Sequence, residues 1–289
     1  MQTILLLGSS GFVGGHLLQA ISMRDNEINK TRILRFNRTD STFYEVNFDH
    51  VVIQIPLKNR KLNEIFMHEQ INVINLMTNP RNSSFRQIQI ANYETPKKVL
   101  ERLISRASSL KWFQINSYFQ FYFSQYKIDK DEYSRQKRLF SDYLTQVCSD
   151  LQIPLTQIYS PHLYGYHEDT RRITAQLREF AQNRIEQLKV SSGDQYLPLL
   201  DVRRFVQAIL QLIYNDNSAE RIYVSPETTS TLREICQLAI SLRADENCRI
   251  VFSSNPERLN EFYKPIHIPD NLMLYDSPGR STFIDYLKG

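Results

Sequence analysis

The order of apolar and polar residues predicts strands and helices that follow one another through the first half of the chain. An uninterrupted apolar run at residues 4–7 predicts a buried strand, and residues 17–21 carry apolar positions at helical spacing. Residues 43–55 favour β structure without a clear division. This alternation is typical of an α/β fold with a doubly wound parallel sheet. Further strands are expected at 32–36, 71–76, 110–115 and 155–158, and further helices at 61–69, 93–107 and 131–148.

Beyond about residue 160 the regular alternation gives way to a mixed pattern. We therefore predict a first domain at residues 1–160 and a smaller mixed α/β part at 161–289, with residues 200–225 returning to the first sheet. Helices are expected there at 173–187, 202–215 and 232–242, and short strands at 187–190, 221–224 and 249–252.

Half of the glycines lie in one turn between the first strand and the first helix. Four of the eight fall within residues 8–15, and Gly8, Gly11 and Gly14 have the spacing G-x-x-G-x-x-G. Glycine lets a backbone approach a ligand without a Cβ, and the amino end of a helix attracts phosphate. An ordinary tight turn is the alternative. The position after a strand and before a helix favours a dinucleotide phosphate site in a Rossmann-type fold.

The end of the second predicted strand indicates which dinucleotide is bound. An acidic residue at this place bonds the ribose 2′-OH of NAD, whereas an arginine accommodates the 2′-phosphate of NADP. Asn37 stands where the acid is expected, with Arg35 and Arg38 beside it. A solvated surface position is the alternative for both arginines. The missing carboxylate favours NADP, used as NADPH, over NAD.

Tyr133 and Lys137 are one turn apart on a predicted helix, which places both side chains on one face. A tyrosine titrates near pH 10 in isolation, and a neighbouring ammonium favours its phenolate, so the pair can exchange a proton near neutral pH. Ser117 lies 16 residues before Tyr133, after the strand at 110–115, where its hydroxyl could polarise a carbonyl. Surface packing is the alternative, since the chain has 16 tyrosines.

Composition and charge narrow the classes of protein. The formal net charge of +4 comes from scattered basic residues, so we expect no nucleic-acid groove. Three cysteines without C-x-x-C spacing and six dispersed histidines predict a reduced cytoplasmic protein without a metal site. No apolar stretch reaches the length of a membrane span, and residues 4–7 are too short for a signal peptide, so we expect no membrane association.

Seven segments occur in an order that belongs to one enzyme family. The glycine turn matches the pattern G-x-x-G-F-[IV]-G, and Ser117, Tyr133 and Lys137 match a Ser/Thr–Tyr–Lys triad in order. The other segments are 74–78, 91–96, 159–165, 200–202 and 230–235. Over nearly its whole length the chain thereby resembles the extended short-chain dehydrogenase/reductases, the NAD-dependent epimerase/dehydratase family. The nearest resemblance is to nucleotide-sugar 4-ketoreductases such as the CDP-abequose and paratose synthases.

The resemblance implies a role for each of these residues. Tyr133 would be the general acid or base, Lys137 would lower its pKa and hold the nicotinamide ribose, and Ser117 would bind the substrate oxygen. A homodimer is expected from the resemblance alone. Arg35 and Arg38, near the end of the second predicted strand, are included among the expected cofactor-binding residues. These are Gly8, Ser10, Gly11, Phe12, Val13, Gly14, Arg35, Arg38, Leu76, Met77, Lys137 and Ser160. The expected substrate-binding residues are Ser117, Tyr118, His162 and Arg258.

The C-terminal part departs from the family pattern. Tyr159 and His162 stand where the family has arginine and asparagine. Asp194 and Gln195 stand where an Arg–Asp pair is expected in the strand that binds the diphosphate. The lost arginine puts the binding of a nucleotide diphosphate in doubt, and Arg258 is the residue that could supply the charge instead.

These features together predict a cytoplasmic NADPH-dependent reductase of a nucleotide-linked 4-keto-6-deoxysugar. Hydride would pass from the nicotinamide to the keto carbon while Tyr133 protonates the oxygen. One alternative is an NAD-dependent sugar-nucleotide epimerase or dehydratase that uses the same triad without net redox change. The other is a non-catalytic dinucleotide-binding protein of the same fold, which the lost arginine and the aromatic residues after Ser117 favour.

Overall fold

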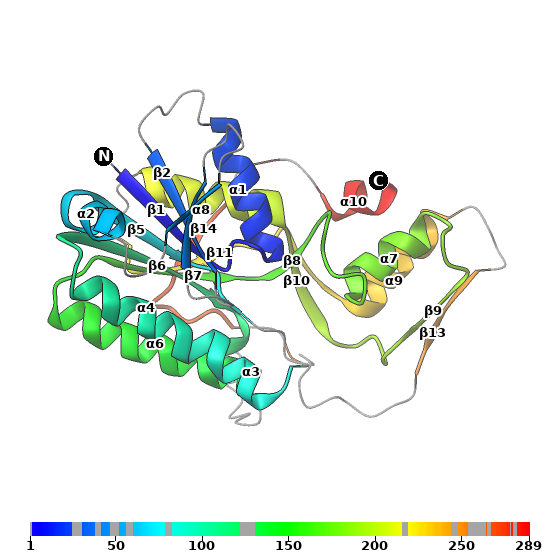
Figure 1. The fold of residues 1–289 in the computed structure, drawn as a ribbon. Helices are drawn as coiled ribbons and strands as arrows, with labels where there is room; N and C mark the ends of the chain where they lie inside the picture. Colours follow the sequence, from blue (N-terminus) through cyan, green and yellow to red (C-terminus); the bar gives the residue numbers. More distant parts are fainter. Residues whose placement is uncertain are drawn as a thin grey trace. The chain divides into compact units, whose positions relative to one another are not determined.

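The computed structural model divides the chain into two compact units, residues 1–159 with 210–222 and residues 160–209 with 223–289. The ribbon in Figure 1 follows both of them from the amino to the carboxyl end. The structure describes residues 2–24, 31–37, 42–46, 52–55, 60–78, 83–121, 131–215, 219–243, 248–253, 264, 267–277, 279 and 282–289.

The largest sheet has the strand order β14-β11-β7-β6-β5-β1-β2-β3-β4, and its strands from β1 to β6 lie in the first unit. β2, β1, β5 and β6 pair in parallel, and β3 and β4 continue the sheet in antiparallel pairing beyond β2. The expected α/β class and doubly wound sheet are confirmed, and residues 43–55 divide into the antiparallel pair at its edge. The strands are β1 (Gln2–Leu7), β2 (Thr31–Asn37), β3 (Thr42–Val46), β4 (Val52–Ile55), β5 (Gln70–Asn75), β6 (Ser109–Ser117), β7 (Leu155–Ser160), β11 (Arg221–Val224) and β14 (Met273–Tyr275).

This topology places three loops at one edge of the sheet. β1, β5 and β6 are neighbours and parallel, so the residues that follow them meet at the same edge. The chain leaves β1 toward β2 on one side, and later returns to β5 on the other side of β1. In open α/β sheets ligands bind at such a reversal of strand order, beyond the carboxyl ends of the strands.

Helices cover both faces of this sheet. In Figure 1, α4 and α6 run together along one face and α1 lies on the other. Trp112 of β6, Phe140 of α6 and Leu100 of α4 are fully buried members of one apolar cluster that binds the helices to the sheet. The helices are α1 (Phe12–Arg24), α2 (Arg60–His68), α3 (Phe85–Gln89), α4 (Thr95–Ile104), α6 (Glu132–Asp150) and α8 (Val202–Tyr214), the last of which passes from the second unit into the first.

The helix expected at 93–107 begins earlier and contains a π turn. A capping box between Ser84 and Gln87 starts α3, which continues through the π turn Ile90–Glu94 into α4. Pro96 lies in the first turn of α4, where a missing N–H is tolerated. Just before it, the N–H of Thr95 donates to the carbonyl of Ile90, five residues back, as in a π turn.

The described part of the second unit contains helices and two small sheets. One sheet has the order β12-β10-β8 and the other is the pair β13-β9. α7 ends at Ala181, short of the expected 187, because Asn183 takes a left-handed φ of 60° that turns the chain toward β9. The elements are α7 (Ile173–Ala181), α9 (Leu232–Ser241), α10 (Phe283–Lys288), β8 (His162–Tyr164), β9 (Gln187–Val190), β10 (Tyr196–Asp201), β12 (Thr228–Thr231) and β13 (Arg249–Phe252).

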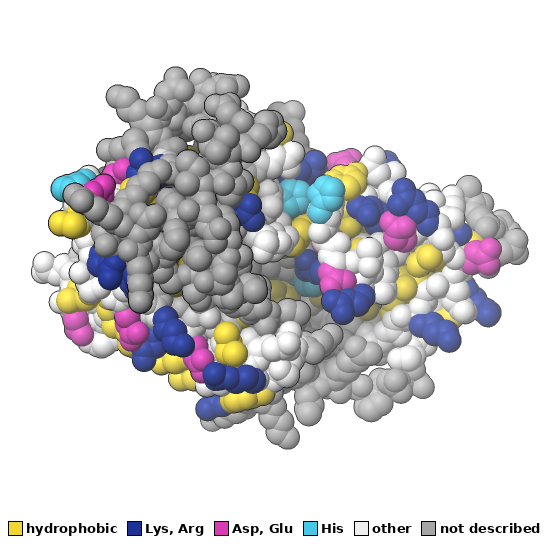
Figure 2. All heavy atoms as spheres, in the orientation of Figure 1, with side chains coloured by type: hydrophobic (Ala, Val, Ile, Leu, Met, Phe, Trp, Pro, Cys, Tyr) yellow, Lys and Arg dark blue, Asp and Glu magenta, His cyan; other side chains and the backbone are white. Residues whose placement is uncertain are grey.

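The surface carries charges of both signs. On the face shown in Figure 2, lysine and arginine side chains lie among aspartates and glutamates over the described residues. Within the described residues, no helix is long and apolar enough to cross a membrane. Nor do the described histidine, cysteine, aspartate and glutamate side chains form a group of three that could hold a metal ion.

Candidate active site in the first unit

The glycine turn is closed by backbone-to-backbone packing that admits no side chain at two positions. Gly8 has a φ of +83°, and a Cβ there would lie 2.9 Å from the carbonyl carbon of Leu76 and from the nitrogen of Met77. A Cβ on Gly14 would lie 2.4 Å from the carbonyl oxygen of Gly8. The first glycine therefore allows the turn to approach the end of β5, and the last allows α1 to approach the turn.

The turn leaves its outer backbone open toward a ligand. Ser10 and Gly11 are exposed, and Phe12 and Val13 are partly exposed in the first turn of α1. The N–H groups at the start of a helix have no partner within the helix and favour a phosphate. Because the backbone at Ser10 and Gly11 is exposed at the start of α1, the turn fits the phosphates of a dinucleotide.

The segment after β5 completes this edge. The N–H of Leu76 donates to the carbonyl of Leu7 at 2.9 Å, which extends the β1–β5 pairing by one residue. The N–H of Met77 donates to Oδ1 of Asn75 at 3.1 Å, and Nδ2 of Asn75 donates to Oε1 of Gln114 at 2.9 Å. The expected cofactor residues Leu76 and Met77 are thus fixed directly beside Gly8.

Arg35 is attached to the glycine turn. Its Nε donates to the hydroxyl of the buried Ser9 at 2.9 Å, which orients the guanidinium at the end of β2. Its two terminal nitrogens have no partner among the residues that the structure describes. Arg38, the other arginine expected at the cofactor, lies outside the described residues, as does the side chain of Asn37.

The long helix α6 carries Tyr133 and Lys137 on one face. Asp131 caps this helix by accepting from the N–H of Ser134 at 3.0 Å. Nζ of Lys137 lies 5.8 Å from the centre of the Tyr133 ring and donates to the carbonyl of Ile115 at 3.1 Å. The lysine is thereby bound to β6 two residues before Ser117, so the tyrosine, the lysine and the end of β6 come together in one place.

Burial changes the acid–base behaviour of Lys137. The side chain is only 4% exposed, and removal from water lowers its pKa from 10.5 to about 8. An ammonium that titrates near neutral pH is suited to a site that exchanges a proton with a neighbouring group.

Ser117 is held through its backbone at the end of β6. Its N–H donates to Oε1 of Gln120 at 2.9 Å, and its hydroxyl oxygen accepts from the N–H of Phe119 at 3.4 Å. The hydroxyl proton can therefore be donated to a substrate oxygen. The expected substrate residue Tyr118 is buried, and its ring packs against Phe119 with 4.5 Å between ring centres.

Two other expected ligand residues belong to the second unit. Ser160 ends β7 and His162 begins β8. Nε2 of His162 accepts from Nη2 of Arg172 at 3.1 Å, and burial together with this guanidinium holds the pKa of His162 well below 6.5. The positive charge beside His162 therefore belongs to Arg172. Arg172 was not among the predicted site residues, because two adjacent arginines are typical of a solvated surface. Arg258 lies outside the described residues.

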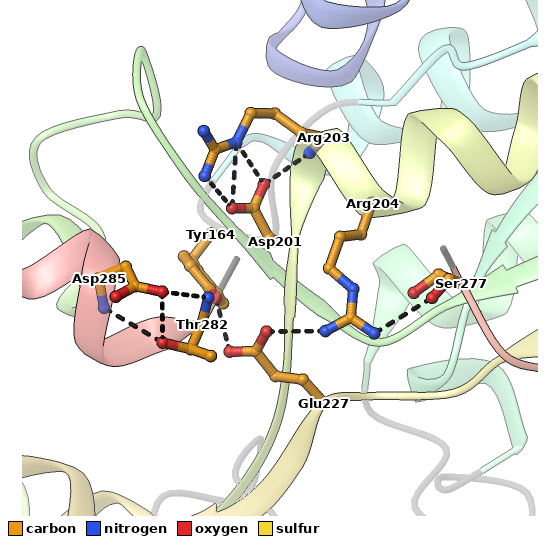
Figure 3. Close-up of polar contacts among 8 residues, drawn as sticks. All are labelled: Tyr164, Asp201, Arg203, Arg204, Glu227, Ser277, Thr282 and Asp285. Atoms are coloured by element: carbon orange, nitrogen blue, oxygen red, sulfur yellow. Dashed lines mark hydrogen bonds and ion pairs between the residues drawn. The ribbon is translucent and has the colours of Figure 1, made fainter. Parts of the chain in front are cut away.

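The segment around Asp201 has a structural role in the second unit (Figure 3). Asp201 accepts from both Nε and Nη2 of Arg203, and its Oδ1 also accepts from the Arg203 N–H at 2.7 Å. Beside it, the Tyr164 hydroxyl donates to Glu227 at 2.5 Å, and Nη1 of Arg204 donates to the other oxygen of Glu227 at 3.4 Å. These contacts join β8, β10 and the start of α8.

Comparison with known proteins identifies the family. The model of the NAD dependent epimerase/dehydratase family matches residues 4–224. Since the match covers most of the chain, the protein belongs to this family and is an enzyme of the extended short-chain dehydrogenase/reductase type, as the sequence analysis predicts. A comparison with curated protein sequences found no significant match.

Solved structures with low sequence identity share the fold. One is dTDP-glucose 4,6-dehydratase from Bacillus anthracis in complex with NAD, with 14% identity, a TM-score of 0.68, and coverage of 100% of this chain and 94% of that chain. RMD from Pseudomonas aeruginosa, complexed with NADPH, has 16% identity and a TM-score of 0.68 over 100% and 97%. A variant of UDP-glucuronic acid 4-epimerase from Bacillus cereus, in complex with a UDP-sugar and NAD, has 14% identity and a TM-score of 0.71 over 99% and 97%. The cofactor type of the family is a nicotinamide dinucleotide.

The glycine turn offers a test with a matched control. Gly14→Ala should lower the free energy of unfolding by about 1–3 kcal/mol and abolish dinucleotide binding, because its Cβ meets backbone atoms that cannot move aside. Gly15→Ala has nothing within 4 Å of the new Cβ and should stabilise α1 by about 0.5–1 kcal/mol. Urea unfolding and NADPH fluorescence titration measure both effects. Equal behaviour of the two variants would contradict the close packing of the turn.

The lowered pKa of Lys137 predicts a dependence of stability on pH. Between about pH 8 and 10.5 the unfolded chain holds a proton on Lys137 that the folded chain has lost, so the free energy of unfolding rises with pH in this window. In this window the free energy of unfolding should rise by about 1.4 kcal/mol per pH unit in the native protein, and this rise should be absent from Lys137→Met. Guanidinium unfolding of both proteins at several pH values gives the difference. A difference that does not change with pH would mean that Lys137 titrates normally.

Proposed function

We propose that the protein is an NADPH-dependent reductase of a nucleotide-linked 4-keto-6-deoxysugar. The observation that carries the proposal is the position of Lys137, which lies beside the Tyr133 ring and is bonded to β6 just before Ser117. The tyrosine and the lysine lie at the same edge of the sheet as the glycine turn. Enzymes of this family use a nicotinamide dinucleotide, which the glycine turn would hold beside them.

The triad residues divide the proton chemistry between them. When bound, the reduced nicotinamide supplies a hydride to the keto carbon. Ser117 donates a hydrogen bond to the keto oxygen, which polarises the carbonyl. Tyr133 transfers its hydroxyl proton to that oxygen as negative charge develops on it. The Lys137 ammonium favours the phenolate that remains and makes this transfer easier, and the ammonium is lost as the pH rises through about 8.

Arg35 supports the preference for NADPH. The guanidinium is held at the glycine turn through Ser9, at the end of β2 where a 2′-phosphate is expected. Its terminal nitrogens can bond a phosphate with two parallel hydrogen bonds.

An NAD-dependent epimerase or dehydratase is the second candidate. The family model includes both reaction types, and several solved structures with this fold hold NAD. Such an enzyme uses the same triad but returns the hydride to the substrate, so its cofactor shows no net oxidation. Titration with NADPH and NADH distinguishes the two, since stronger NADH binding would favour the second candidate.

Removal of one hydroxyl tests the catalytic role of Tyr133. With CDP- or dTDP-4-keto-6-deoxyglucose and NADPH, Tyr133→Phe should lower kcat by about 10²–10⁴-fold, because the proton donor is lost, and leave the Kd of NADPH within about twofold. Tyr143→Phe is the matched control on the same helix, where the lost hydroxyl bonds Glu101 at 3.2 Å. The loss of NADPH absorbance gives the rates. Full turnover by Tyr133→Phe would exclude the proposed mechanism.

Arg35→Leu tests the choice of cofactor. The Kd of NADPH should rise about 10- to 100-fold, as expected for charge-assisted hydrogen bonds, while the Kd of NADH changes by less than about threefold. Arg32→Leu, three residues earlier on β2, removes an ion pair with Glu69 and should leave the ratio of the two constants unchanged. Equal weakening of both dinucleotides by Arg35→Leu would show that Arg35 does not recognise the 2′-phosphate.

A further inference from the structure

We propose that Gln120 and Ser141 are positioning residues that hold Ser117 at a fixed place relative to Tyr133 and Lys137. The inference rests on the proposed function, because it assigns the orientation of the Ser117 hydroxyl to two side chains outside the triad. Both side chains are buried, Gln120 at 6% exposure and Ser141 at 5%.

A chain of buried hydrogen bonds begins at the Ser117 backbone. The N–H of Ser117 donates to Oε1 of Gln120 at 2.9 Å, and Nε2 of Gln120 points to the hydroxyl oxygen of Ser141 at 3.5 Å, the longest contact of the chain. The Ser141 hydroxyl donates to Oδ1 of Asn116 at 3.0 Å. Ser117 and the residue before it are therefore both bonded, directly or through Gln120, to one hydroxyl on α6.

The chain of hydrogen bonds continues to a backbone carbonyl of α6. Nδ2 of Asn116 donates to Oε1 of Gln157 at 3.0 Å, and Nε2 of Gln157 donates to the Thr145 hydroxyl oxygen at 2.9 Å. The Thr145 hydroxyl donates to the carbonyl of Ser141 at 2.8 Å. The path from Ser141 through Asn116, Gln157 and Thr145 thus closes on Ser141 itself and joins α6, β6 and β7.

The backbone groups at the two ends determine the direction of every bond in the chain. A backbone N–H can only donate, so the oxygen of Gln120 must face Ser117 and its NH₂ must face Ser141. The Ser141 oxygen then accepts and its proton goes to Asn116. At the far end a carbonyl can only accept, so Thr145 must donate to it. Rotation of any of the three amides, those of Gln120, Asn116 and Gln157, by half a turn would bring two donors or two acceptors together in a buried place.

The spacing of Tyr133, Lys137 and Ser141 along α6 links this chain of hydrogen bonds to the triad. Tyr133, Lys137 and Ser141 follow one another at intervals of four residues, so they lie along one face of the helix. Lys137 bonds the carbonyl of Ile115, and Ser141 reaches Asn116 directly and Ser117 through Gln120. Successive turns of the same face thereby bind successive residues of the β6 end. The separation of Ser117 from Tyr133 follows from these attachments.

The consequence for catalysis is one of geometry. A hydroxyl that polarises a carbonyl works only when it and the proton donor are correctly placed together, and a displacement of about 1 Å can cost on the order of 100-fold in rate. Loss of Gln120 or Ser141 leaves Ser117 chemically intact and releases its backbone. The expected defect is therefore in kcat, with little change in the binding of the cofactor or of the substrate.

The test compares Gln120→Leu and Ser141→Ala with Ser117→Ala. With CDP- or dTDP-4-keto-6-deoxyglucose and NADPH, the first two should lower kcat by about 10- to 100-fold, with KM and the Kd of NADPH changed by less than about twofold. Ser141→Thr keeps the hydroxyl and should restore kcat to within about threefold of the native enzyme. Hydrogen exchange of the peptide 110–121 should become faster in Gln120→Leu and Ser141→Ala and stay native-like in Ser141→Thr.

Thr3→Val is the matched control for loss of a buried hydroxyl. Thr3 is fully buried near the start of β1, where it donates to Glu69 at the edge of the sheet opposite the triad. This variant should lose stability but keep kcat and the exchange of peptide 110–121.

Each outcome decides between the two proposals. Native kcat in Gln120→Leu and Ser141→Ala, with a loss in Ser117→Ala, would overturn the positioning role alone. A rise in KM with native kcat, or failure of Ser141→Thr to recover, would also overturn it. Native kcat in Ser117→Ala would overturn the proposed mechanism and the positioning role with it.

Discussion

The buried attachment of α6 to the carboxyl end of β6 is the interaction on which the candidate active site depends. Lys137 gives up its hydration to donate to the carbonyl of Ile115, and the fall of its pKa from 10.5 to about 8 corresponds to a cost of about 3 kcal/mol. Phe140 and Leu144 are fully buried on the same helix, and each contributes about 1.5–3 kcal/mol. The apolar packing of α6 therefore offsets the burial of its lysine and keeps the ammonium next to Tyr133.

The two units differ in how they use buried polar groups. In the first unit, amide and hydroxyl side chains form a directed chain of hydrogen bonds from the backbone of β6 to the backbone of α6, next to the residues proposed for proton transfer. In the second unit, tyrosine and arginine side chains enclose carboxylates such as Glu227 and hold the strands and the C-terminal segment together. Burial raises the pKa of Glu227, so its bonds to Tyr164 and Arg204 are needed to keep a carboxylate there. The sequence motif at residues 200–202 is explained by this framework, in which Asp201 is bound by Arg203.

Much of the fold could be predicted from the sequence because it depends on local patterns. The alternation of strands and helices, the spacing of Gly8, Gly11 and Gly14, and the interval between Tyr133 and Lys137 are all visible within a few residues. The antiparallel pairing of β3 and β4 was not predicted, because residues 43–55 contain two strands without a clear turn signal. The early start of the helix at Phe85 depends on a capping box that the pattern of apolar residues does not reveal.

The parts of the site that escaped prediction are contacts between distant residues. Asn116 and Gln157 are 41 positions apart, and Gln120 and Ser141 are 21 apart, so nothing in the local sequence indicates that they bond. Arg172 was not predicted as a site residue, because only the folded second unit brings its guanidinium to His162. Polar residues of ordinary type become informative only when burial requires each donor to have an acceptor.

Transfer of the hydride from NADPH to the sugar can be followed with an isotope label. The native enzyme is incubated with NADPH that carries deuterium in the transferred position and with CDP- or dTDP-4-keto-6-deoxyglucose, and the sugar product is analysed by NMR. The proposed reduction requires one deuterium at C4 of the product for each NADPH oxidised, and a corresponding loss of turnover in Tyr133→Phe. A sugar product that forms without deuterium at C4 and without NADPH oxidation would contradict the proposed reduction.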